Sequence, residues 1–165
     1  MDGSLLSSLL PEMLQTERSA MLHCAREASR VDEAVAFALG KTSEHAKDSL
    51  TTLRDLAKAR GVTPSVGEAV GRALSELRDK IADRMLASQT SYRGTLLGMR
   101  HGYDIFVLTR EAAVREHDAE FAAFAGWWLD TRGPLIEDVA RSLSWFAEHP
   151  VRALRRATSA QPVHA

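Results

Sequence analysis

The sequence predicts an all-α chain that folds as an antiparallel four-helix bundle with an additional crossover helix. Hydrophobic residues recur at spacings of three and four over most of the chain, which is typical of amphipathic helices. The composition agrees, because 45% of the 165 residues are hydrophobic and only five are proline. Residues 91–116 are apolar over most of the helix circumference, so we expect other helices to surround this segment. A chain of this length forms one domain, which we place at residues 1–157, followed by a disordered tail at 158–165.

Acidic and basic residues nearly balance, with a formal net charge of −1, and both signs are mixed along the chain. Such a surface has no general attraction for nucleic acid or an anionic membrane. No apolar run reaches membrane-spanning length. The single cysteine, Cys24, suits a reducing compartment, and Asp2 stands where a signal peptide carries positive charge. We therefore expect a cytoplasmic protein with no nucleic-acid or membrane partner.

The first helix is predicted at residues 5–28, where one face is apolar. Pro11 is tolerated there only because it lies near the start, since proline lacks the backbone donor. The apolar face consists of Leu6, Leu10, Met13, Met21, Cys24 and Ala28.

A boundary between the first two helices is predicted near Ser29. The run Ser-Arg-Val-Asp that begins there has the spacing of a capping box, with Asp in place of the usual Glu. The second helix then covers residues 31–60 and stops at Gly61. In the alternative, the first helix continues to Gly40 and the second begins at Ser43. The core face of the second helix consists of Val35, Leu39, Ala46, Leu50, Leu53 and Ala57.

The next amphipathic pattern, at residues 63–86, predicts the crossover helix. Its apolar stripe consists of Val66, Val70, Leu74, Leu77 and Ile81. A polar joint at residues 88–91 should separate it from the helix at 91–116.

Three glycines stand four residues apart in the helix at 91–116: Gly94, Gly98 and Gly102. Each glycine inside a helix costs about 1 kcal/mol relative to alanine, so the three require a structural reason. Because they follow one stripe of the helix, we expect another helix to approach closely along that stripe.

The last long helix is predicted to begin after Asp118, which is a natural N-cap. The Gly133-Pro134 pair should kink or split it, because proline removes a donor and clashes with the preceding turn. Trp145 is placed opposite its apolar neighbours, and an outward tryptophan indicates an interface unless the kink rotates it inward.

Glu17 is the most informative polar residue, because it lies at the centre of the apolar face of the first helix. A buried carboxylate must be protonated, paired or bound to a metal. We expect a structural pair with a buried Arg, Thr or His. The alternatives are metal ligation and a first helix displaced from the predicted position.

Two further pairs are candidate metal ligands, His45 with Asp48 and His101 with Asp104, because a spacing of three puts both members on one side of a helix. His101 is expected inside the buried arc and Asp104 nearer solvent. His45 has the simpler interpretation of a histidine at the edge of a packed interface. Its neighbourhood is small and polar for a buried surface, so it can also line a ligand cavity. The neighbours are Ala38, Thr42, Ser49 and Thr52.

A resemblance to a known family rests on a few residues. They are Glu17 in the middle of the first helix, and the Glu44-His45 pair on the second helix, which ends at Gly61. With two long helices, a connecting element and two more long helices from Leu5 to about His149, the chain resembles the ferritin-like superfamily. It looks most like the small stress-associated bundles with a short helix in the crossover. Di-iron members carry Glu-x-x-His on two helices, and the sequence has no such motif. The resemblance therefore implies the scaffold rather than oxidase chemistry.

The function we expect is that of a non-enzymatic bundle that self-associates, a homodimer first of all, or binds a protein partner. Three observations favour this binding function: the glycine stripe, the outward Trp145 and the lack of a complete catalytic constellation. The alternative is an iron- or manganese-binding redox or stress-response protein. Its ligands would come from Glu17, His45, Asp48, His101 and Asp104.

Overall fold

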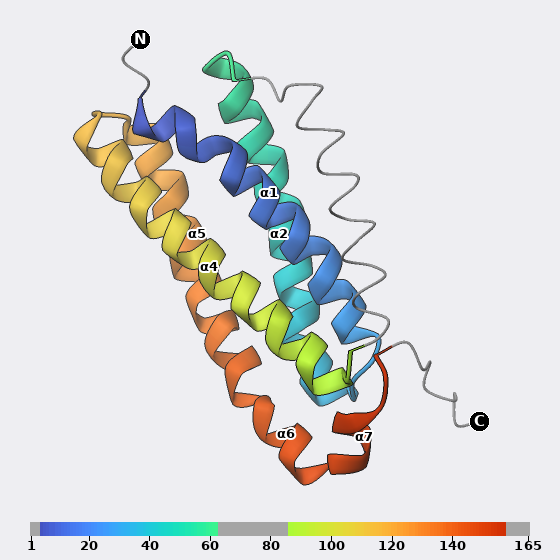
Figure 1. Cartoon of the computed structure of the whole chain (residues 1–165). Helices are drawn as coiled ribbons and strands as arrows, with labels where there is room; N and C mark the ends of the chain where they lie inside the picture. The colour runs from blue at the N-terminus through green and yellow to red at the C-terminus, as the bar shows by residue number, and fades with distance from the viewer. Residues whose placement is uncertain (1–3, 63–85, 158–165) are drawn as a thin grey trace.

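The computed structural model describes residues 4–62 and 86–157, and this part of the chain is built from helices (Figure 1). They are α1 (Leu5–Ala28), α2 (Glu33–Ala59), α4 (Ser88–Arg115), α5 (Ala119–Arg141), α6 (Leu143–Glu148) and α7 (Pro150–Leu154). Over these residues the prediction of an all-α chain is confirmed, and the only β pairing is an isolated bridge between Ala87 and Arg156. None of the described helices is both long and apolar enough to cross a membrane. The predicted crossover helix, except its last residue, and the predicted tail fall outside the described residues.

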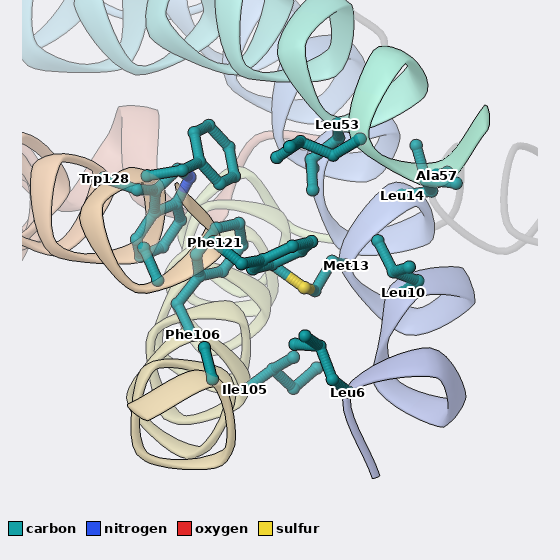
Figure 2. Packing of buried hydrophobic residues seen from close by; sticks show 14 of the residues in the cluster. Leu6, Leu10, Met13, Leu14, Leu53, Ala57, Ile105, Phe106, Phe121 and Trp128 are labelled. Carbon is teal, nitrogen blue, oxygen red and sulfur yellow. The ribbon is translucent and has the colours of Figure 1, made fainter. Parts of the chain in front are cut away.

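The four long helices form two hairpins that pack on each other (Figure 1). Short connections join α1 to α2 and α4 to α5, while α1 contacts α4 and α2 contacts α5 across the hairpins. All four contribute to one hydrophobic core, where the Phe106 ring stacks on the Trp128 indole with centroids 3.7 Å apart. Figure 2 shows residues of this core converging from the separate helices. A second cluster reaches α6 and α7 and includes Cys24, Leu39, Tyr92, Val139, Phe146 and Ala153.

The connection between α1 and α2 lies near Ser29, as predicted. The alternative boundary is wrong, because Gly40 lies inside α2. The capping box itself is not formed. Ser29 follows the last residue of α1 and donates its hydroxyl to the Arg26 carbonyl at 2.7 Å. Asp32 holds the N-cap position of α2, where its carbonyl accepts the Val35 and Ala36 N–H groups, but its side chain makes no capping hydrogen bond.

Trp145 is half-buried, which corrects the expectation of an outward side chain. Its indole N–H donates to Asp32 Oδ2 at 3.1 Å, and its ring meets the edge of Phe146 with centroids 5.0 Å apart. Asp32 also pairs with Arg152 of α7. The outward placement assumed that the last long helix continues without interruption to Trp145. The chain instead turns at Ser142 before α6 begins, so that pattern does not apply to Trp145.

Helix α5 continues through Gly133 and Pro134 and ends at Arg141, so of the predicted kink or split at Gly133-Pro134, the split is wrong. Proline removes one backbone donor from a helix and leaves the carbonyl four residues earlier unpaired. Pro134 and the residue four positions before it, Asp130, are both exposed. Water can therefore satisfy the Asp130 carbonyl, which explains why the helix tolerates the proline.

The start of α4 differs from the prediction, and the start of α5 agrees with it. The predicted polar joint at residues 88–91 is instead the first turn of α4, where the Ser88 N–H donates to the Arg155 carbonyl at 2.7 Å. The N-cap of α5 is Asp118, as predicted, and its carboxylate accepts the Phe121 N–H at 3.0 Å.

Among the described residues, the glycine stripe of α4 makes a close helix contact only at Gly102. Gly102 is buried, and a Cβ added there would lie 3.6 Å from Thr16 Cβ of α1. Gly94 and Gly98 are exposed, and an added Cβ would meet no described atom within 4 Å. Four residues advance an α-helix by about 40° beyond a full turn, so the stripe winds away from α1 towards the start of α4. The close approach expected at Gly94 and Gly98 is therefore wrong.

Substitutions at Gly98 and Gly102 should have opposite effects on stability. Gly98→Ala should raise the free energy of unfolding by up to about 1 kcal/mol, because alanine favours the helix and the site is open. Gly102→Leu should lower it by about 1–3 kcal/mol, because the larger side chain collides with α1. Urea denaturation measures both, with Gly98→Leu as the size-matched control. Equal losses for the two leucine variants would contradict the contact at Gly102.

Candidate functional site

Three buried polar side chains from three helices meet inside the bundle, and we call them the buried triad. They are Glu17 of α1, His45 of α2 and Arg132 of α5, which are 1%, 7% and 1% exposed. Arg132 Nη2 donates to Glu17 Oε2 at 2.9 Å, and Arg132 Nε donates to His45 Nδ1 at 3.1 Å. The guanidinium therefore bridges the carboxylate and the imidazole.

Each member of the triad reaches the interior because it lies on the buried face of its helix. Glu17 is flanked one turn away by Met13 and Ala20, which are both buried. Arg132 follows Trp128 by one turn of α5, and its guanidinium carbon lies 4.6 Å from the centre of the Trp128 ring. This cation–π contact supports the guanidinium on a second side, so both the ion pair and the aromatic core position Arg132.

Burial dominates the electrostatics of the triad. It raises the pKa of Glu17, although the positive charge of Arg132 opposes the shift. It lowers the pKa of Arg132, and the charge of Glu17 opposes that shift. Burial, together with the charge of Arg132, lowers the pKa of His45 to about 4, so the imidazole is neutral near neutral pH. With Glu17 ionised, the triad carries no net charge, which limits the cost of placing it in a medium of low dielectric.

The geometry at His45 fixes which ring nitrogen carries the proton. Because Nδ1 accepts from Arg132, a neutral ring carries its proton on Nε2. Nε2 has no hydrogen-bond partner among the described residues. Trp127, which is 45% exposed, packs beside the ring with centroids 4.7 Å apart. His45 therefore serves Arg132 as an acceptor, and its basic nitrogen is occupied.

The structure confirms that Glu17 is buried and supplies the paired arginine that we expected. His45 is buried as well, and both side chains contact the same guanidinium group. Two of the five predicted metal ligands are thus brought together, with Arg132 between them.

The other three predicted ligands, Asp48, His101 and Asp104, are exposed and do not join the triad. The expectation that His101 lies in a buried arc is wrong, because the buried face of α4 is centred on the side towards Met99 and Phe106. Within residues 4–62 and 86–157, no group of three or more His, Cys, Asp or Glu side chains could hold a metal ion.

Arg132 is the site residue that the sequence analysis overlooks. It precedes Gly133 and Pro134, which indicate a helix break and draw attention away from the arginine. A signal was nevertheless present, because Phe124, Trp128 and Arg132 follow one another at spacings of four. An arginine that continues a buried aromatic stripe predicts a buried acid opposite it.

The small polar residues Thr42 and Ser49, beside His45, hydrogen-bond within their own helix. The Thr42 hydroxyl donates to the Ala38 carbonyl and the Ser49 hydroxyl to the His45 carbonyl, both at 2.8 Å. Both hydroxyls are therefore satisfied within α2. Cys24 is also inert, because burial raises the pKa of its thiol to about 12.

A second buried acid, Glu27, joins α1 to α4. It is fully buried, accepts the Ser91 hydroxyl at 2.6 Å and pairs with Arg30 at 2.9 Å. Like Glu17, it occupies the interior with its charge compensated by an arginine.

Comparison with known proteins does not identify the site. No protein-family model, curated protein or solved structure matches the chain. Function is therefore inferred from the residues and their geometry.

Changing both partners of the ion pair together should destabilise the protein by less than the sum of the two single changes. Arg132→Met leaves the Glu17 carboxylate without its cation and should lower the free energy of unfolding by about 3–5 kcal/mol. Glu17→Gln should cost about 1–3 kcal/mol, because the amide keeps the shape and some hydrogen bonding. The double variant should lose less than the sum, which a double-mutant cycle by urea denaturation measures. Strictly additive losses would show that the two side chains do not interact.

The pH dependence of stability should report His45. Between pH 6.5, its ordinary pKa, and pH 4, near its folded value, the unfolded chain binds a proton that the folded chain does not. The stability contributed by the neutral ring is complete above that window and is lost as the pH falls through it, by about 1–3 kcal/mol. His45→Asn keeps an acceptor near Nδ1 but does not titrate. Urea denaturation across the window should therefore show a shallower pH dependence for the variant.

The raised pKa of Glu17 acts with the opposite sign, since its stabilising effect is lost as the pH rises through the folded value. The contribution of Glu17 is present in the parent and in His45→Asn, so it cancels when the two pH dependences are compared. The same pH dependence in the parent and in His45→Asn would rule out a neutral, buried His45.

Proposed function

We propose that this chain is a ferritin-like helical bundle without a catalytic centre, which works in the cytoplasm by binding a second copy of itself or another protein through its surface. One observation carries the proposal. The guanidinium of Arg132 occupies the interior position between Glu17 and His45.

Metal centres in helical bundles are built from inward carboxylates and imidazoles whose acceptor atoms face the ion. Here Glu17 Oε2 and His45 Nδ1 accept hydrogen bonds from a cation that belongs to the chain. A guanidinium keeps its proton in proteins, so its charge is permanent. A metal ion at the same acceptor atoms would be repelled by Arg132, which supports a structural role for the triad.

The helix arrangement supports the ferritin-like part of the proposal. Two hairpins, α1 with α2 and α4 with α5, pack so that the first helices of each hairpin touch and the second helices touch. The polypeptide between α2 and α4 then joins helices of different hairpins, which fits a crossover connection.

The surface supports the binding part of the proposal. Several apolar side chains on the described helices stay largely exposed, and aromatic residues among such side chains are favoured anchors of protein interfaces. The most exposed are Phe37 at 68%, Leu97 at 69%, Val151 at 72% and Leu154 at 74%.

The alternative function, an iron- or manganese-binding redox protein, has one observation in its favour. Glu17 Oε2 and His45 Nδ1 lie 2.9 and 3.0 Å from the same atom, Arg132 Nη2. If Arg132 moved out, an acid and an imidazole would face one space.

Metal titration separates the two functions. Addition of Fe(II) or Mn(II) to protein purified without an affinity tag should leave the melting temperature of the parent unchanged, because Arg132 holds the acceptor atoms. A ligand that binds the folded state raises the melting temperature with its concentration. Stabilisation of the parent that disappears in Glu17→Gln would overturn the proposal and favour the redox function.

A further inference from the structure

A surface groove of about 450 Å³ runs between α2 and the junction of α5 with α6. We call it the Phe37 groove. Its lining includes Val35, Phe37 and Ala38 from α2, and Asp138, Arg141, Trp145 and Glu148 from the other side.

The groove places a protruding aromatic side chain beside a hollow. Phe37 is 68% exposed, and Lys41 Nζ lies 5.9 Å from the centre of its ring. Its neighbours Val35 and Ala38 are buried at 5% and 6% exposure and form an apolar wall. Trp145 lines the opposite wall, held there by its bond to Asp32. A protruding ring and a shallow, open hollow therefore share one face of the molecule.

We propose that a second copy of this chain occupies the Phe37 groove, in a two-fold dimer in which Phe37 of each copy inserts into the groove of the other. The inference rests on the proposed function, since it names the partner for that surface. A two-fold interface brings the same patch of both subunits together, so the patch must be complementary to itself. A patch that contains both a protruding ring and a hollow meets this requirement.

The charges around the groove fit a second copy better than a strongly charged partner. Among the lining residues, Asp138 and Glu148 are acidic and Arg141 is basic, so two negative charges and one positive charge sum to −1. Lys41, beside the Phe37 ring, pairs with Glu44 at 2.8 Å, so this pair adds no net charge. The patch therefore carries both signs and little net charge, and an acid of one copy can oppose Arg141 of the other. A highly acidic or basic partner would find no matching excess of charge.

Sedimentation velocity of the full chain at micromolar concentrations tests the proposal. The parent should sediment as a dimer that dissociates on dilution. Phe37→Ser removes the protruding ring and should weaken the dimer at least tenfold. Ser144→Trp fills the groove from its exposed rim and should weaken it similarly. Leu97→Ser is the matched control, because Leu97 is 69% exposed on α4 and does not line the groove.

Each outcome decides the inference. A parent that stays monomeric overturns it, as does a dimer that survives both groove variants or dissociates equally in Leu97→Ser. Circular dichroism of the exposed-site variants checks that they remain folded. Failure here leaves the proposed function intact as binding to a different protein, because metal titration, rather than sedimentation, tests the structural role of the triad.

Discussion

The ion pair between Arg132 and Glu17 links α5 to α1 across the interior of the bundle, although these two helices are not packed neighbours. Both side chains are 1% exposed, and a buried charge without a partner costs several kcal/mol. A shift of α5 by one turn would move Arg132 by about 5 Å and separate it from Glu17 and His45. Hydrophobic cores tolerate many arrangements of similar volume. We infer that the triad selects one register among the packings that the core alone would allow.

The sequence predicted the helices well because their evidence is local. Periodic apolar residues, the change of pattern at Ser29 and the cap at Asp118 depend on neighbours in the chain. Glu17 could be predicted to be buried for the same reason, since its place on the apolar face follows from helix geometry. The identity of its partner could not, because Arg132 is 115 residues away and reaches Glu17 only once the four long helices have assembled around a common interior.

The errors in the sequence analysis arose where a local pattern was extended to predict a contact. Gly94 and Gly98 were assigned to the packed stripe because a spacing of four resembles a straight line, although it drifts around the helix. Trp145 was assigned to the outside by extending the face pattern of the last long helix, but the chain turns at Ser142 before α6 begins. Asp32 was expected to complete a capping box that starts at Ser29, but its carboxylate accepts a bond from Trp145 and pairs with Arg152. At Asp32 the tertiary partners competed with the local one and prevailed.

The triad also affects whether a ligand can bind inside the bundle or only at its surface. A metal ion bound by Glu17 and His45 would have to displace Arg132, whose guanidinium would then need another acid inside the bundle. The second buried acid in the described part of the chain, Glu27, is already engaged by Arg30 and Ser91. Displacement would thus leave a permanent charge buried without compensation, or require α5 to separate from its neighbours. Binding through the exterior needs no such rearrangement, which is why the geometry favours the surface over the interior.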